Sequence, residues 1–379
     1  MPTPMSKKVR ILSLDGGGIR GVIPAGVLIY VEKKLQELSG NENARLADYF
    51  DMIAGTSTGA ILGCFYCIPH PNKGEPNQPN VRDTAETALD FYMKHGYGIF
   101  NGSRYPSWFG LRQLWNGTTF DVTYLENLFK QEFGDLKLHE LIKPCVVTTY
   151  AMNWQSSYFF YSREDKPYRE FFVRDVVRST SAAPTFFAPA KIKNQAYAEA
   201  QAAVERGELR EEEVIEDMVN IDGGVFANNP AMCAYAEARQ GTFNGVERPS
   251  SKDMIMLSIG TGGGQLTFPN LENSATWGVL NWATTLPDLM IDGSADTVSF
   301  QIEQIFGTST EGHQNYLRLD VPASYRESPG YASDMTDASE ENLQALKGAA
   351  EATVEANKAE LDALIQKLID NAPDDTPST

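Results

Sequence analysis

Short apolar runs alternate along this chain with longer segments in which apolar residues recur at helical spacing. The apolar runs typical of buried strands lie at 11–14, 50–54, 144–150, 157–161, 218–221, 254–259 and 316–319. Helical spacing is found at 22–38, 84–95, 122–133, 230–239, 296–306 and 339–369. Strands that alternate with helices in this way predict an α/β protein with a mainly parallel central sheet.

The sequence Gly-Thr-Ser-Thr-Gly at residues 55–59 lies between two apolar runs. A G-x-S-x-G motif between a strand and a helix is typical of a nucleophile elbow, a sharp turn that exposes the serine hydroxyl. Gly55 and Gly59 suit this role, because side chains there would crowd the turn and block access to Ser57. Taken alone, the pentapeptide would favour an ordinary helix N-cap over an elbow.

A second glycine-rich segment, Asp-Gly-Gly-Gly-Ile-Arg-Gly at residues 15–21, follows the first predicted strand and opens a helix. Such a loop presents unpaired backbone N–H groups and therefore binds anions. In a serine hydrolase that anion is the oxyanion of the tetrahedral intermediate. The loop also matches the dinucleotide fingerprint G-x-G-x-x-G, but no acidic residue closes the second strand, since Asp51 lies at that strand's start.

A third segment places Asp222-Gly223-Gly224 directly after the strand-like run 218–221. A common Asp-Gly turn is one interpretation. The same Asp-Gly-Gly arrangement follows the first strand, however, and sites in parallel α/β sheets assemble at strand ends. We therefore expect Asp222 to belong to the same site as Ser57.

In this order the three segments resemble the patatin family of lipid acyl hydrolases. Further similarity to plant patatins lies at 43–51, 257–262, 277–280, 315–318 and 335–339, so the resemblance runs from about residue 9 to about residue 346. It implies a three-layer α/β/α fold and calcium-independent hydrolysis of fatty acyl esters by a Ser-Asp dyad. Carried over by position, the resemblance makes Ser57 the nucleophile and Asp222 the base, with Gly16, Gly17, Gly18 and Arg20 in the oxyanion loop.

Two of these assignments have structural alternatives. Arg20 is also compatible with a surface charge on the first helical turn. His313 follows Ser57 and Asp222 in the Ser-Asp-His order of α/β-hydrolases, so a triad is formally open, although the resemblance favours the dyad.

Two aromatic segments are candidates for contact with the acyl chain. Phe186 and Phe187 lie in a patatin-like element, residues 179–187, and are expected either in the substrate pocket or in the core. Residues 103–115, which include Trp108, are rich in aromatic side chains and predict a lid or lipid contact, with a satellite core as the alternative. A charged stretch, 198–217, precedes Asp222.

Composition limits the partners. The net charge of −18 disfavours nucleic acid and electrostatic docking on anionic membranes. No apolar run reaches the roughly 18 residues of a spanning helix. We therefore expect a phospholipid or another fatty acyl ester as substrate, and only peripheral, local apolar contact with lipid aggregates or a membrane surface.

No cofactor or metal is expected. Cys64 and Cys67 form a C-x-x-C pair, but Cys145 and Cys233 look isolated, and zinc would need a second pair of ligands. Buried reduced thiols and the lack of an apolar leader in residues 1–10 favour a cytoplasmic protein.

The 379 residues predict a single catalytic domain, 1–370, with a disordered tail, 371–379. Two other classes of function stay open on the sequence. They are a catalytically weak lipid-binding or storage protein and, more remotely, a dinucleotide-dependent oxidoreductase.

Overall fold

The computed structural model describes residues 7–75, 78–100, 119–163, 168–263, 279–308 and 314–372. Three predictions fall elsewhere: the aromatic segment 103–115 with Trp108, the alternative base His313, and all but two residues of the tail 371–379. They lie outside the described residues.

The core of the molecule is an eight-stranded sheet in the order β10-β9-β1-β2-β3-β6-β5, with β4 also paired to β3. Its strands are β1 (Val9–Leu14), β2 (Met52–Gly55), β3 (Cys145–Ala151), β4 (Ser156–Tyr161), β5 (Ala190–Lys193), β6 (Asp217–Asp222), β9 (Met254–Ile259) and β10 (Tyr316–Leu319). A separate two-stranded ribbon pairs β7 (Thr242–Phe243) with β8 (Val246–Glu247).

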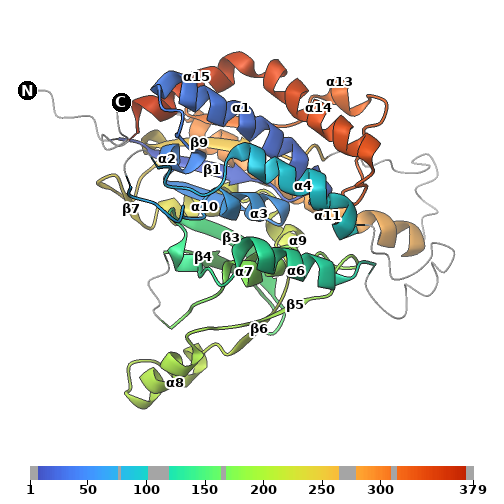
Figure 1. Cartoon of the computed structure of the whole chain (residues 1–379). Coiled ribbons are helices and arrows are strands. Elements are labelled where there is room, and N and C mark those ends of the chain that lie inside the picture. Colours follow the sequence, from blue (N-terminus) through green and yellow to red (C-terminus); the bar gives the residue numbers. More distant parts are fainter. Residues whose placement is uncertain are drawn as a thin grey trace, which may run out of the picture.

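Helices cover both faces of the sheet (Figure 1). They are η1 (Gly18–Gly21), α1 (Val22–Ser39), α2 (Leu46–Tyr49), α3 (Thr58–Phe65), α4 (Ala85–Phe100), α6 (Val122–Phe133), η3 (Leu138–Glu140), α7 (Val173–Thr180), α8 (Tyr197–Glu205), η4 (Glu211–Glu213), α9 (Gly224–Ala227), α10 (Ala231–Ala238), η5 (Ser251–Asp253), α11 (Val279–Gly307), α13 (Ala323–Arg326), α14 (Glu340–Ala356) and α15 (Lys358–Asp370). None of those helices has the length and apolar composition that a membrane-spanning segment requires, within the ranges described.

The side chains of β1 show how the layers form. Leu12 and Leu14 join the larger apolar cluster, which includes residues of α1, α3, α7, α14 and α15. Val9 and Ile11 point to the opposite face and join a second cluster with α10 and α11. Because strand side chains alternate, a strand that is apolar on both faces must be covered twice. The predicted three-layer α/β/α fold is therefore confirmed.

The sheet is mixed in a way that matters for the site. Strands β10, β9, β1, β2 and β3 pair in parallel, whereas β6 and β4 each pair antiparallel with β3, and β5 pairs antiparallel with β6. In-register residues Leu14, Gly55 and Ile259 end three neighbouring strands at one level. The loops that follow them therefore meet at a single edge of the sheet.

Several sequence-based boundaries were wrong. The predicted helix 339–369 is two helices, α14 and α15, because Asn357 leaves helical geometry (φ −123°) and its side chain bonds the Thr353 carbonyl. Both helices lie along α1 (Figure 1). The helix predicted for 296–306 begins at Val279 and continues through Gly293. The charged stretch 198–217 includes all but the first residue of α8, which projects from the body beside β5 and β6 (Figure 1).

Candidate active site

Ser57 occupies a strained turn between β2 and α3, as the elbow motif predicts. Its backbone has φ 52° and ψ −122°, a region that residues with side chains rarely adopt. A Cβ on Gly55 would lie 2.4 Å from Ala60 backbone atoms, and one on Gly59 would lie 2.2 Å from the Leu14 carbonyl oxygen. The glycines thus allow the helix to start tightly against the ends of β1 and β2.

The Ser57 hydroxyl donates directly to a buried carboxylate. Its Oγ lies 2.7 Å from Oδ2 of Asp222, a residue that is 5% exposed. The other oxygen, Oδ1, accepts from the Gly224 N–H at 2.7 Å. Burial raises the pKa of Asp222 to about 6, although the bonds from Gly224 and Ser57 act to lower it. Serine and carboxylate therefore meet without an intervening histidine.

The strand that brings Asp222 to Ser57 runs in a direction that the sequence did not predict. We expected a parallel strand whose carboxyl end lies with the others, but β6 is antiparallel to β3. Asp222 pairs with Thr149, two residues beyond Val147, which is level with Gly55. Strand β6 starts beyond the carboxyl end of β3 and runs back toward it. Its last residue therefore stops at the level of the elbow.

The end of α7 and the residues after it hold both Ser57 and Asp222 in place. The Ser57 N–H donates to Thr180 Oγ1 at 2.9 Å, and the Asp222 N–H donates to the Ala182 carbonyl at 3.0 Å. The sequence places residues 179–187 either in the substrate pocket or in the core, and it does not predict these two contacts. No local signal in the sequence reveals them, because both contacts are long-range.

The glycine loop lies against Ser57 and is held by its neighbours. A Cβ on Gly16 would lie 3.3 Å from Ser57 Cβ. The Gly16 N–H is already bonded to the Asn228 carbonyl at 3.1 Å. The Gly16 carbonyl accepts from Thr261 Oγ1 at 2.7 Å. Gly16 is therefore committed to internal bonds, and its N–H is not available to a ligand.

The next two residues differ from Gly16. For the N–H groups of Gly17 and Gly18, no acceptor lies in the part of the chain that the structure describes. Gly18 has φ +58°, and a Cβ there would lie 2.3 Å from the Met335 carbonyl oxygen. The loop thus carries two unpaired donors next to the serine, in a conformation that requires glycine.

Arg20 is not the surface charge that one interpretation allowed. It is 5% exposed, and its Nη1 donates to the Ser333 carbonyl at 2.8 Å. The Ile19 N–H bonds the Met335 carbonyl at 2.9 Å. Arg20 therefore ties η1 to the loop before α14, which is a structural contact with the far end of the chain.

Phe186 and Phe187 belong to an aromatic cluster with Phe100 and Phe120. The Phe187 ring lies 5.6 Å from Phe120 and 6.2 Å from Phe100, and Phe186 stacks on Phe120 at 6.2 Å. Phe187 is buried and Phe186 partly buried. Packing explains both residues, and direct contact with substrate stays a prediction.

The cysteines pack in the core, with one correction. Cys64, Cys67 and Cys145 are all buried. Cys145 is not isolated, since a hydrogen bond with Cys67 and burial raise the pKa of its thiol. Within the described ranges, no group of three or more His, Cys, Asp or Glu residues has the geometry to hold a metal ion.

Comparison with known proteins gives a consistent result. The family model for patatin-like phospholipase matches residues 12–235. Patatin-like protein 2 of Oryza sativa subsp. indica is 31% identical, over 98% of this chain and 89% of the relative. Patatin-like protein 2 of Arabidopsis thaliana is 33% identical, over 91% and 82%. Patatin of Solanum tuberosum is 29% identical, over 90% and 82%.

Proposed function

This chain belongs to the patatin-like phospholipase family, and we propose that it is a serine lipid acyl hydrolase that cleaves fatty acyl esters through Ser57 and Asp222. One observation carries the proposal: the 2.7 Å contact between Ser57 Oγ and Asp222 Oδ2 at a strained strand-to-helix turn. A serine hydroxyl becomes a strong nucleophile when an adjacent base takes its proton. Asp222 has the position of that base.

In the acylation step, Ser57 Oγ attacks the ester carbonyl carbon while its proton passes to Asp222 Oδ2. The carbonyl oxygen becomes an oxyanion, for which the N–H groups of Gly17 and Gly18 are the donors we assign. Gly16 and Arg20 keep the loop in shape. The intermediate then expels the alcohol, which takes its proton from Asp222, and leaves an acyl group on Ser57.

In the deacylation step, water repeats the cycle on the acyl-enzyme. Asp222 takes a proton from water, hydroxide oxygen bonds to the acyl carbon, and the proton returns to Ser57 Oγ as the fatty acid leaves. The pKa of about 6 suits both steps. Asp222 is ionised at neutral pH, yet it is more basic than an exposed aspartate.

The substrate class follows from the family and from charge. We propose phospholipids and related fatty acyl esters, presented at a lipid surface that the protein contacts peripherally. A chain with a net charge of −18 gains no long-range attraction to anionic lipid, so contact has to rest on local apolar side chains. We propose that neither a cofactor nor calcium takes part.

Two other functions were open on the sequence. A lipid-binding or storage protein has no need of a serine that is held by a buried carboxylate in a strained turn. A dinucleotide site would need an acidic residue at the end of β2, where this chain has the Ser57 elbow. These observations favour the hydrolase.

A fluorophosphonate probe tests the proposal. We expect rapid labelling of the wild-type protein and none of Ser57→Ala. Ser251→Ala, which removes a buried hydroxyl at the opposite edge of the sheet, should label normally. Incubation with a mixed phospholipid extract should then release free fatty acids, detected by mass spectrometry. A folded wild-type protein that neither labels nor releases fatty acid would instead favour lipid binding or storage.

A further inference from the structure

We infer that Arg318 is a positioning residue for the proposed reaction, because it holds and electrically balances Asp15 at the start of the glycine loop. This inference rests on the proposed function. Arg318 does not touch Ser57 or Asp222 through any described contact, so its effect would pass through Asp15 and the residues next to it.

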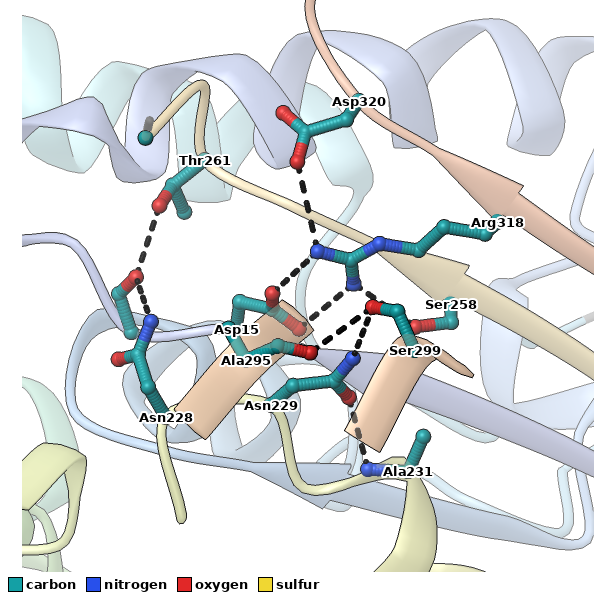
Figure 2. Close-up of polar contacts among 12 residues, drawn as sticks. Asp15, Asn228, Asn229, Ala231, Ser258, Thr261, Ala295, Ser299, Arg318 and Asp320 are labelled. Atoms are coloured by element: carbon teal, nitrogen blue, oxygen red, sulfur yellow. Dashed lines mark hydrogen bonds and ion pairs between the residues drawn. The ribbon is translucent and has the colours of Figure 1, made fainter. Parts of the chain in front are cut away.

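The guanidinium of Arg318 reaches from the edge strand β10 across β9 to the end of β1 (Figure 2). Its Nη1 donates to Asp15 Oδ1 at 2.9 Å, and its Nη2 donates to Asp15 Oδ2 at 2.6 Å. Nη1 also donates to Ser258 Oγ on β9 at 2.9 Å. One planar side chain thus joins the ends of three strands, which fixes where the loop after β1 begins.

The path of this side chain depends on a glycine. A Cβ on Gly260 would lie 2.7 Å from Arg318 Nη2 and 2.3 Å from Asp320 Oδ2. Gly260 directly follows β9, and a side chain at this position would block the approach of Arg318 to Asp15. Residues 257–262 and 315–318 both carried resemblance to patatins, but the sequence assigned them no role.

A second set of contacts leads from Arg318 to the same loop. Arg318 Nη2 lies 3.4 Å from Asp320 Oδ2, and Asp320 Oδ1 accepts from the Gly262 N–H at 2.9 Å. Thr261, the residue before Gly262, donates to the Gly16 carbonyl at 2.7 Å. Arg318 therefore supports both sides of the Gly16 peptide, through Asp15 and through Thr261.

Charge gives a second reason. Asp15 is 2% exposed, and burial raises its pKa to about 6 although Arg318 acts to lower it. At pH 8 it is ionised, two residues before Gly17. Two residues span at most about 7 Å. Where Asp15 stays ionised, a carboxylate about 7–10 Å from the developing oxyanion that no cation balances would slow the reaction roughly ten- to a hundredfold.

The chain contains a matched control. Arg10 and Asp51 form another buried pair with two guanidinium bonds, of 3.0 and 2.7 Å, at the opposite edge of the sheet. Loss of either arginine should lower stability. Only loss of Arg318 should lower turnover in the folded protein.

The test compares Arg318→Ala, Arg10→Ala and Asp15→Asn/Arg318→Ala with wild type on a short, soluble ester at pH 8, per folded molecule. We expect kcat of Arg318→Ala to fall about thirtyfold with KM within threefold. Arg10→Ala should keep kcat within threefold. The double variant, which removes the unbalanced carboxylate, should recover at least fivefold over Arg318→Ala.

Equal losses in the two arginine variants, or no recovery in the double variant, would overturn the inference. If Arg318→Ala does not fold, Arg318→Lys replaces it in the test, because lysine keeps the charge but lacks the planar guanidinium. The kcat of Arg318→Lys should fall about tenfold at unchanged KM. An unchanged kcat in this variant would overturn the inference. Ser57→Ala separates the two hypotheses. Wild-type turnover that survives in Ser57→Ala refutes the proposed function, whereas turnover that needs Ser57 but not Arg318 refutes only this inference.

Discussion

The two ends of strand β1 carry the same kind of ion pair in different surroundings. Near its start, Arg10 binds Asp51 through two guanidinium nitrogens, and just beyond its end Asp15 is bound in the same way by Arg318. Arg10 is fully buried, and Asp15 is 2% exposed. Breaking a buried pair typically costs 3–5 kcal/mol, so both pairs should matter for folding.

At the first end, Asp51 links the start of β1 to the turn between β7 and β8. Its Oδ2 also accepts from the backbone N–H of Arg10 at 2.8 Å and from Asn244 Nδ2 at 3.1 Å. A cavity of about 540 Å³ opens beside it, but its lining contains neither serine nor cysteine. The Arg163 guanidinium at this cavity donates to the backbone carbonyls of His139 and Leu141.

At the second end, the ion pair of Asp15 and Arg318 lies at the start of the glycine loop. Gly17 and Gly18 have N–H groups without an acceptor among the described residues, and Ser57 is held in a strained turn against Asp222. The same kind of ion pair can therefore serve stability alone or also support a site, depending on the groups around it. The edge where parallel strands end is also where crossover loops leave room for a ligand.

The largest expected effect is on turnover, which should depend on Asp222 and not on Asp51. Ser57→Ala and Asp222→Asn should each lower turnover roughly 10⁴-fold, as loss of a nucleophile or base does in serine hydrolases. Asp51→Asn, at the other edge, should keep turnover within about threefold per folded molecule. Turnover of a soluble ester, normalised by circular dichroism, measures all three.

The same assay decides the role of histidine. His313→Ala should stay within about tenfold of wild type, less than the ~10²–10⁴-fold typical of losing a general base. A folded His313→Ala protein as inactive as Ser57→Ala would make His313 the base and refute the dyad.

A smaller effect is expected from Gly18 in the loop, compared with Gly40, which caps the end of α1. Gly18→Ala has to move the backbone away from the Met335 carbonyl and should lower kcat by about 10²–10³-fold, the loss seen when an oxyanion donor is removed. Gly40 also has positive φ (+67°), but a Cβ there has nothing within 4 Å. Gly40→Ala should cost about 1–2 kcal/mol of stability and no turnover. Equal turnover in the two variants would remove Gly18 from the oxyanion loop.

The pKa of Asp222 predicts a third difference. Its folded value of about 6 lies above the ordinary 3.8, so the folded state holds the proton more tightly. Stability therefore falls as pH rises from about 4 to about 6, by about 3 kcal/mol in total. Asp222→Asn lacks this loss and should be more stable than wild type at pH 8, by up to that amount.

Urea unfolding at pH 4 and pH 8 checks this prediction. The stability advantage of Asp222→Asn should be present at pH 8 and absent at pH 4. In wild type, kcat/KM should rise with pH through about 6, because only ionised Asp222 can accept the Ser57 proton. A stability advantage of Asp222→Asn that is the same at pH 4 and pH 8 would mean that the pKa of Asp222 is not raised to about 6 by folding.

The last prediction is that removal of divalent metal ions leaves turnover unchanged. Turnover should persist in excess chelator, because the dyad needs no Lewis acid to activate Ser57. Wild type assayed with and without chelator, and again after calcium is added, measures this. Activity that chelator abolishes and calcium restores would refute the metal-free mechanism at this edge.

The local features of the protein were readable from its sequence. The elbow at Ser57 and the glycine loop depend on residues within a few positions of each other, and the alternation of strands with helices follows from side-chain periodicity. The three-layer fold, which the resemblance to patatins implied, was predicted correctly. The helix break at Asn357 was missed because the apolar stripe continues across it, on two helices that pack on α1.

The long-range partners were decided only by the tertiary structure. Hydrophobic periodicity does not encode strand order or direction, so it could not show that β6 runs antiparallel and still brings Asp222 to the elbow. Nor could it show that Arg20 is buried against the Ser333 carbonyl. The contact between Asp15 and Arg318 spans 303 residues and exists only because β9 and β10 lie beside β1. The motifs pointed to Ser57 and Asp222 as candidate groups, and the order and direction of the strands decided which side chains hold them.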